Sequence, residues 1–279
     1  MTATVPLSFL VPSYNAGPYL ALTIESIEDQ LVDGDEVIIQ DGGSNDGSVD
    51  AVVARWGDQP WFQSVSERDK GQADALQKAL DKATNDYIVW LNADDIIYPG
   101  ALDSVRTALV DKPDLVAGRS TIFKNDGRVV RTYTPGEFSR KAFIGLGSNM
   151  FTGSFAYRTS LVREVGGFNA DYQYCMDMDL FARLAETEPS IVYIPEVFGG
   201  LRWHDDSKGA NTTWPIIREA TEIRLAHSRS LRERFIAVRA STLYLIGILT
   251  QPIRHAKLYS TVRNKLRRST RSQPHATTP

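Results

Sequence analysis

The first 120 residues alternate between short apolar runs and segments whose apolar residues recur with the spacing of a helix. Strands are predicted at 7–11, 36–40, 62–66 and 87–91, and helices at 19–29, 48–56, 71–83 and 100–111. Apolar strands that alternate with helices are typical of a mostly parallel sheet covered on both faces. This part of the chain is therefore expected to have a Rossmann-like α/β fold.

A polar segment follows each of the four predicted strands. These segments are 12–15, 41–46, 67–71 and 92–95. Ligands of open parallel sheets bind beyond the carboxyl ends of the strands. We therefore expect the ligand site where these four segments meet.

Two adjacent carboxylates, Asp94 and Asp95, follow the last of these strands. Side by side they repel each other and are costly to remove from water. A divalent cation such as Mg²⁺ relieves that cost, because it takes one or two carboxylates together with substrate phosphate oxygens. The alternative is an ordinary turn, in which Asp is common.

The pattern becomes mixed after residue 120. A hairpin is predicted at 121–134, with strands at 191–194 and 197–202 and helices at 177–186, 214–236 and 237–250. We therefore divide the chain into an N-terminal half (1–120), a second half of the same domain (121–212), and C-terminal helices with a basic tail (213–279).

The net charge of −3 conceals an asymmetry between the two ends of the chain. Residues 234–279 contain nine Lys and Arg and no Asp or Glu, whereas residues 1–233 carry 22 basic against 34 acidic residues. A basic tail of this kind favours contact with a polyanion such as a membrane surface or nucleic acid. The alternative is a solvated terminus.

Four motifs occur in an order that is informative as a set: 9–15 (FLVPSYN), 41–48 (DGGSNDGS), 67–75 (ERDKGQADA) and 91–95 (LNADD). This set resembles glycosyltransferase family 2, over roughly residues 5–205. The resemblance implies a GT-A fold and an inverting enzyme of hexosyltransferase type, which uses Mg²⁺ or Mn²⁺. Such an enzyme moves a sugar from a nucleotide-diphosphate sugar to an acceptor hydroxyl, in polysaccharide or glycoconjugate synthesis.

The resemblance also assigns the nucleotide site by position. Asp41 would accept a hydrogen bond from the base N3–H, which favours UDP or dTDP, and Lys70 would offer its charge to the phosphates. The full set of predicted donor-binding residues is Pro12, Ser13, Tyr14, Asp41, Ser44, Asp69, Lys70, Gly71, Asn92 and Asp94.

At the metal site, Asn92 stands where the family more often has an aspartate. We therefore assign the metal to Asp94 and Asp95 and leave Asn92 for a ribose hydroxyl. His204 is a candidate third ligand or diphosphate contact, although a histidine after a strand is more often a surface or packing residue. Arg202 and Lys208 are candidates for stabilising the departing diphosphate.

The general base is expected in the segment 175–184 (CMDMDLFARL), which resembles the family's Glu-Asp motif with Met176 in the place of Glu. An inverting transfer needs one base to take the proton of the acceptor hydroxyl. Asp177 matches that position, and its alternative role is a helix N-cap. Asp179 is the rival candidate, and its alternative role is an i,i+4 pair with Arg183.

Two other functions compete with sugar transfer. One is a non-catalytic nucleotide-sugar-binding protein, which the replacements at Asn92 and Met176 would suit. The other is a nucleotidyltransferase, which would need a basic loop near the N-terminus, whereas 12–18 has no Lys or Arg.

The expected partners are the sugar donor and a saccharide or lipid-linked acceptor, without nucleic acid. Location in the cytoplasm is expected, since the chain has a single cysteine and no apolar leader. The apolar run 243–249 is too short to span a bilayer, but with the basic tail it could lie at the inner face of the membrane. The alternative is a helix packed on the catalytic domain.

Overall fold

The strands of the protein form one mixed sheet within the residues that the computed structural model describes, which are 4–145, 150–204 and 214–249. The strands are β1 (Leu7–Ser13), β2 (Glu36–Asp41), β3 (Phe62–Ser66), β4 (Tyr87–Trp90), β5 (Ile96–Ile97), β6 (Leu115–Lys124), β7 (Val129–Tyr133), β8 (Phe155–Arg158) and β9 (Ile191–Trp203). The helices are α1 (Tyr19–Glu28), α2 (Ser48–Trp56), α3 (Gln72–Lys82), α4 (Ala101–Leu109), α5 (Arg140–Ile144), the 3-10 turn η1 (Thr152–Ser154), α6 (Thr159–Glu164), α7 (Met176–Glu186), α9 (Trp214–Ala226) and α10 (Leu231–Leu249).

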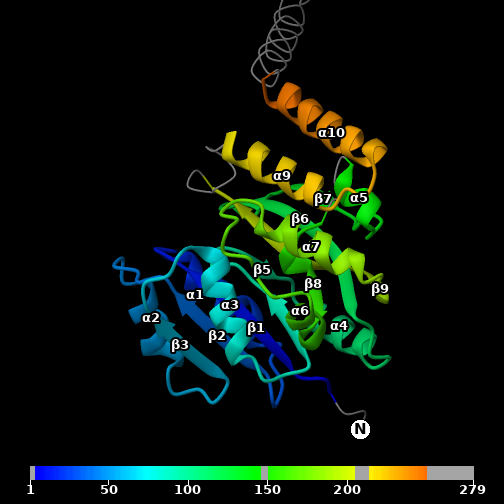
Figure 1. Cartoon of the computed structure of the whole chain (residues 1–279). Helices are drawn as coiled ribbons and strands as arrows, with labels where there is room; N and C mark the ends of the chain where they lie inside the picture. Colours follow the sequence, from blue (N-terminus) through cyan, green and yellow to red (C-terminus); the bar gives the residue numbers. More distant parts are fainter. Residues whose placement is uncertain (1–3, 146–149, 205–213, 250–279) are drawn as a thin grey trace, which may run out of the picture.

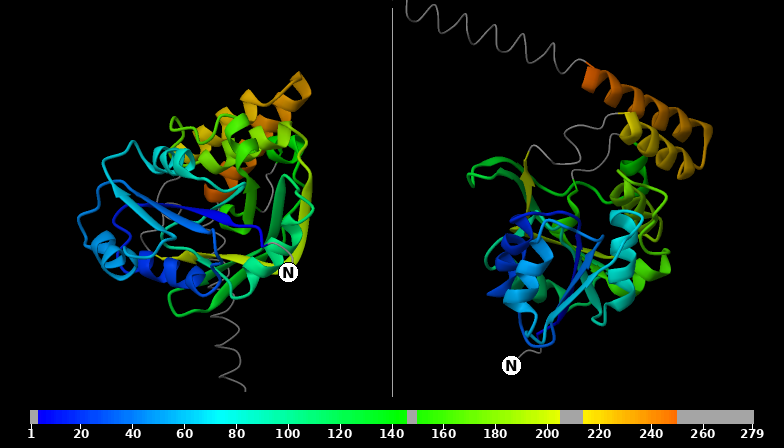
Figure 2. Two further views of the ribbon diagram at one scale, coloured as in Figure 1. Left: turned by 90° about the horizontal axis from the view of Figure 1, so that it is seen from below. Right: turned by 90° about the vertical axis from the view of Figure 1, so that its left-hand side faces the viewer.

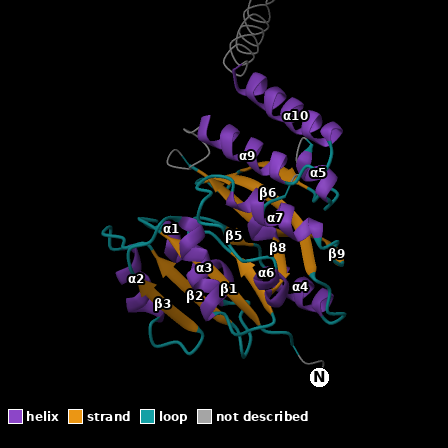
Figure 3. Ribbon diagram, viewed as in Figure 1, coloured by secondary structure: helices purple, strands orange, loops and turns teal. Residues whose placement is uncertain are grey.

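The N-terminal half is the parallel part of the sheet, with the strand order β3-β2-β1-β4. Side chains of β1 alternate between two cores, as expected for a strand buried on both faces. Phe9 packs with α1, α2 and α4 on one face, and Leu10 packs with α3 and α7 on the other. Figure 3 shows these helices on both sides of the strands, so the predicted α/β architecture is confirmed.

The second half extends the same sheet in the order β8-β6-β9-β5, with β7 on β6. β8 is antiparallel to both β4 and β6, and β6 runs parallel to β9. It follows that β4, β6 and β9 all point the same way. β6 crosses residue 120, so both halves share one sheet (Figure 1).

Two sequence predictions differ from the structure. The strands predicted at 191–194 and 197–202 form one strand, β9, which passes through Pro195 with a shift of register against β6. The missing N–H of Pro195 is accommodated at this irregularity. The helix predicted at 214–236 is also wrong, because the chain breaks after α9 and starts α10 at Leu231.

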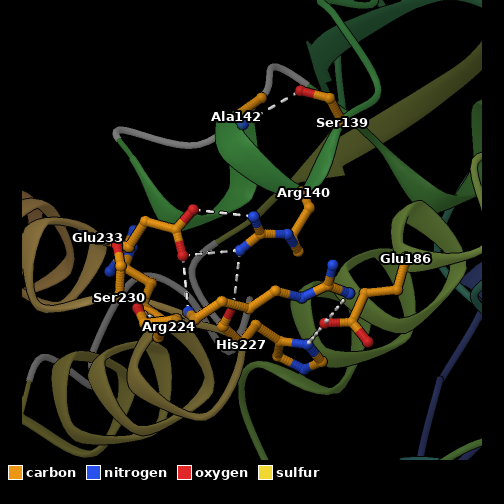
Figure 4. Close-up of polar contacts among 10 residues, drawn as sticks. Ser139, Arg140, Ala142, Glu186, Arg224, His227, Ser230 and Glu233 are labelled. Carbon is orange, nitrogen blue, oxygen red and sulfur yellow. Dashed lines mark hydrogen bonds and ion pairs between the residues drawn. The ribbon is translucent and has the colours of Figure 1, made fainter.

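Helices α9 and α10 lie at the end of the molecule opposite the N-terminus (Figures 1 and 2). Figure 4 shows the hydrogen bonds that attach these two helices to α5. Arg140 of α5 donates two hydrogen bonds to the Glu233 carboxylate, at 2.8 and 2.9 Å, and one to the His227 carbonyl at 3.0 Å. The hydrogen bonds from Arg140, and next the one from the Arg229 N–H, lower the pKa of Glu233 to about 2. His227 in turn lies 2.9 Å from a Glu186 carboxylate oxygen of α7. None of the described helices is long and apolar enough to cross a membrane.

Candidate active site

The predicted site segments meet at one edge of the sheet. Since β1, β2, β4 and β9 point the same way, their carboxyl ends bring together Ser13, Asp41, Asp94 and His204. The loop that follows β3 joins them through Asp69, because a Cβ added to Gly42 would lie only 2.8 Å from a carboxylate oxygen of Asp69. Loops that are far apart in the sequence therefore lie together at this edge of the sheet.

The Asp41 carboxylate organises the loop between β2 and α2. It accepts from the Gly43 and Ser44 backbone N–H groups at 3.0 and 2.8 Å, and from the Ser44 and Ser66 hydroxyls at 2.5 and 2.6 Å. Burial acts to raise its pKa, but these hydrogen bonds outweigh burial and the pKa is lowered. Asp41 is therefore a buried, ionised carboxylate with four donors already around it, and its contact with a nucleotide base stays a prediction.

Around this loop lie the other predicted donor-binding residues. Asp69 accepts from the Gly71 N–H at 2.8 Å, Tyr14 is exposed, and Pro12 is buried at the end of β1. The Ser13 hydroxyl is buried, and none of the described residues offers it a hydrogen-bond partner. A buried hydroxyl of this kind is expected to have a partner, which a ligand could supply.

Asn92 and Asp95 tie β4 to β9. The Asn92 side-chain oxygen accepts from Trp90 and Gln72, at 2.8 and 2.7 Å, and its NH₂ group donates to Asp95 at 2.7 Å. The other Asp95 oxygen accepts from the Arg202 N–H at 3.0 Å. Burial first, and then the neighbouring Asp94 charge, raise the pKa of Asp95 well above its ordinary value. The roles assigned to Asn92 and Asp95 toward ribose and metal stay predictions, since both side chains already serve the fold.

Asp94 faces outward beside His204. Its carboxylate lies 3.0 Å from the His204 Nε2, and its side chain is 34% exposed. The His204 ring lies against Tyr19, with centroids 4.9 Å apart. Arg202 donates to the Asp94 carbonyl at 2.9 Å, and its guanidinium lies over the Phe123 ring.

Of the three predicted metal ligands, the structure brings Asp94 and His204 together and directs Asp95 inward. Among the described residues no group of three His, Cys, Asp or Glu side chains is placed to hold a metal ion. A carboxylate and an imidazole are nevertheless two ligand types that divalent metals accept. The pair therefore fits a cation whose remaining ligands come from a diphosphate and water.

Helix α7 carries both candidate bases. Asp177 is half-buried in the first turn, where burial raises its pKa and hydrogen bonds from backbone N–H groups offset only part of that effect. Asp179 is buried and accepts two hydrogen bonds from Arg183, at 2.9 and 2.6 Å. Arg183 also donates to the Val165 and Gly167 carbonyls, so the Asp179–Arg183 pair ties α7 to the end of α6.

Glu219 of α9 is a residue that the sequence analysis missed. Its carboxylate is 3% exposed and accepts from three consecutive backbone N–H groups, those of Gln173, Tyr174 and Cys175, at 3.1, 2.8 and 2.9 Å. These residues lead directly into α7. The separation of at least 44 residues leaves no local signal for this contact. The adjacent Cys175 thiol is a packing group, since burial raises its pKa to about 12.

A cavity of about 280 Å³ lies beside β6, β7 and β9. Its lining residues are Ser120, Thr121, Ile122, Tyr133, Met150, Phe151 and Leu201. Leu201 precedes Arg202 on β9, so the two side chains point to opposite faces of the sheet. Arg202, whose side chain contacts the Asp94 carbonyl, is not among the residues that line the cavity.

The fold resembles those of solved glycosyltransferases. S. aureus TarS 1–349 in complex with UDP superposes with a TM-score of 0.62 at 16% identity, over 86% of this chain and 71% of that one. GalNAc-T7 with UDP, GalNAc and Mn²⁺ gives a TM-score of 0.60 at 13% identity, over 80% of this chain and 48% of that one.

Sequence relatives include two polysaccharide synthases. Hyaluronan synthase of Pasteurella multocida is 31% identical over 192 residues, which cover 65% of this chain and 19% of that protein. Chondroitin synthase of Escherichia coli is 28% identical over 191 residues, which cover 66% and 27%. The match thus spans about a fifth to a quarter of these synthases. The family model of glycosyl transferase family 2 matches residues 8–166. The chain therefore belongs to glycosyl transferase family 2 and has a GT-A fold.

Proposed function

We propose that the protein is an inverting transferase that moves a sugar from a nucleotide-diphosphate sugar to an acceptor hydroxyl. The observation that carries the proposal is the shared edge where the Asp41 loop, Asp69 and the Asp94–His204 pair lie together. Relatives that make hyaluronan and chondroitin support a role in polysaccharide or glycoconjugate synthesis. Neighbours solved with UDP and UDP-GlcNAc support UDP or dTDP as the nucleotide.

In this proposal the nucleotide lies along the loops that follow β1, β2 and β3. The buried Ser13 hydroxyl and the exposed Tyr14 ring supply polar and stacking contacts, and Asp41 is the candidate partner of the base. Lys70, which is exposed in the loop before α3, offers its ammonium to the phosphates.

A divalent cation, Mg²⁺ or Mn²⁺, would be held by Asp94 and His204 together with diphosphate oxygens. The Mn²⁺ present in the GalNAc-T7 structure supports this part of the proposal. When bound, the cation would offset the negative charge that develops on the departing diphosphate. Asp95 and Asn92 would keep the Asp94 backbone in place, and Arg202 would add positive charge near the same edge.

Asp177 is our assignment for the base. The acceptor oxygen forms its bond to the sugar C1 as the bond from C1 to the diphosphate oxygen breaks, and the hydroxyl proton passes to the Asp177 carboxylate. A pKa raised by burial suits a general base, because the carboxylate then holds the proton more tightly. Asp179 is less suited, since its carboxylate is engaged by Arg183.

The final part of the proposal is contact with a membrane surface through the basic C-terminal segment. Its support is the charge distribution, with nine Lys and Arg and no acidic residue after position 233.

A thermal-shift and hydrolysis experiment tests the donor and metal. The melting temperature of the full chain is measured with Mn²⁺ and UDP, dTDP, ADP or CDP, and release of sugar from UDP-sugars is then followed with and without EDTA. We expect UDP and dTDP to stabilise most, because adenine and cytosine lack the N3–H that Asp41 would bind, and ligands of the native state raise its stability. Equal stabilisation by all four nucleotides would remove Asp41 as a base reader. Binding without metal-dependent sugar release would favour a non-catalytic protein.

A further inference from the structure

The outer face of α10 carries large apolar side chains that the described part of the protein leaves exposed. Leu231 is 86% exposed, Phe235 70%, and Val238 and Ile246 each 49%. Their spacing of four, three and eight residues places them on one side of the helix. We name these four residues the α10 outer stripe.

The opposite side of α10 packs against the rest of the protein. The buried side chains of α10 are small and belong to Ala237, Ala240 and Ser241. Arg224 of α9 donates to the Ser241 hydroxyl at 3.3 Å, and Glu233 is held by Arg140. The inner side therefore attaches α10 to the rest of the protein, and Figure 1 shows α10 as the outermost of the described helices at this end of the molecule.

The charged residues beside the α10 outer stripe are arginines, which favour an anionic partner. Arg232, Arg234 and Arg239 are all exposed on α10, and helical geometry places them on its flanks. The one acidic residue of the helix, Glu233, is engaged inward by Arg140, and no acidic residue follows it in the sequence. An apolar stripe with cationic flanks has the pattern of a helix that lies in the interface of an anionic membrane.

A second copy of the chain is a poorer partner for the same surface. Two outer stripes packed together would bring the flanking arginines of both copies close to one another, without an acidic residue to pair with them. Such like charges in contact oppose association. The phosphate groups of an anionic bilayer supply the missing charge.

We propose that α10 lies flat on an anionic lipid surface, with Phe235 and Val238 at the centre of the contact and the flanking arginines at the lipid phosphates. The proposal rests on the peripheral membrane contact stated above and adds the surface that makes it. It moves the centre of contact away from the predicted run 243–249 to the first turns of α10.

Vesicle cosedimentation with a paired set of variants tests this surface. The full chain is mixed with vesicles of phosphatidylcholine alone or with phosphatidylglycerol, at low and high salt. The test variant is Phe235→Glu with Val238→Glu. The matched control is Val129→Glu with Val130→Glu on β7, two valines that are also about half exposed.

We expect the full chain and the β7 control to bind vesicles that contain phosphatidylglycerol, and to bind phosphatidylcholine vesicles weakly. The α10 variant should bind the anionic vesicles at least about tenfold more weakly, because it loses two buried apolar side chains and places two carboxylates against anionic lipid. High salt should weaken binding of the full chain.

Donor hydrolysis without vesicles separates this proposal from the proposed enzymatic function. The α10 variant should hydrolyse the donor as the full chain does. If this variant alone loses both vesicle binding and donor hydrolysis, it is misfolded, and the milder change Phe235→Ser is tested in its place. The proposal is overturned if the α10 variants bind anionic vesicles as strongly as the full chain does. It is also overturned if vesicle binding is lost only in a tail variant that carries Arg263→Gln, Arg267→Gln and Arg268→Gln. A concentration-dependent dimer that the α10 variant abolishes would also overturn it and assign the stripe to self-association.

Discussion

Replacing Glu219 by glutamine should loosen the chain that leads into α7. In the protein, one Glu219 oxygen accepts from the Gln173 N–H and the other accepts from the N–H groups of Tyr174 and Cys175. Glutamine can keep only one acceptor oxygen in this place. If that oxygen keeps the two shorter bonds, the NH₂ group is turned toward the Gln173 N–H, where two donors face each other.

The expected cost follows from this count of bonds. A hydrogen bond to a charged group contributes about 1.5–3 kcal/mol, and a neutral one about 1 kcal/mol. Glu219→Gln loses one hydrogen bond to a charged acceptor and weakens the other two, because their acceptor becomes neutral. We therefore expect the free energy of unfolding to fall by roughly 2–4 kcal/mol. Urea unfolding should show this as a midpoint lower by about 1 M or more, at unchanged slope.

The same variant bears on catalysis, because Asp177 lies in the first turn of α7. A displaced helix start should lower kcat for transfer and leave donor binding in place. The matched control is Glu222→Gln on the exposed side of α9, which should change neither stability nor kcat. The reasoning is refuted if Glu219→Gln unfolds at the same urea concentration as Glu222→Gln.

Three further predictions follow from individual side chains. Asp177→Asn should lower transfer by ~10²-fold or more with donor affinity nearly unchanged, as measured by initial rates and by calorimetric titration of UDP. The variant should also be more stable than the wild type at neutral pH. A carboxyl whose pKa is raised in the folded state favours folding only while it is protonated, so this difference should shrink as the pH falls toward the ordinary value of 3.8. Asp94→Ala should abolish the stabilisation that Mn²⁺ adds to UDP in thermal shifts, and retained metal dependence would remove Asp94 as a ligand. Gly42→Ala should raise KM for the donor, since the new methyl group would displace Asp69, whose carboxylate lies 2.8 Å from the built Cβ.

The first half of the fold was predictable because its signals are local. Strands β1 to β4 and helices α1 to α4 begin and end within about two residues of the segments expected from apolar spacing. Strands β1, β2 and β4 are buried on both faces and each helix on one, so the sequence pattern there reflects the packing directly, whereas the edge strand β3 is largely exposed.

Other elements depend on partners far away in the chain. β5 is only two residues long and exists through its pairing with Gly199 and Gly200 of β9, which no local pattern predicts. The start of α10 did carry a local signal, because Ser230 and Glu233 have the spacing of a capping box. The Ser230 hydroxyl accepts from the Glu233 N–H at 3.2 Å, but the surrounding apolar residues had suggested an unbroken helix.

The directions of the Asp94 and Asp95 side chains could not be predicted from the sequence either. The sequence placed Asp94 and Asp95 at the end of β4, but two adjacent residues in a turn can point in different directions. The structure turns Asp95 inward to the Arg202 N–H and leaves Asp94 beside His204. The choice is made by β9, whose final residues lie more than 100 positions further along the chain.

Asn92 is best understood from the burial of its neighbour. An aspartate in its place would put a second carboxylate 2.7 Å from an Asp95 oxygen, inside a region where burial already raises the pKa of Asp95. The amide instead donates to Asp95, and its oxygen accepts from Trp90 and Gln72, so every polar atom of the pair is engaged within the protein. The replacement of the family's usual aspartate thus converts one potential ligand into part of the support that holds Asp94 outward. Loss of one carboxylate here weakens the case for a metal held by three protein ligands and leaves the case for Asp94 and His204 intact.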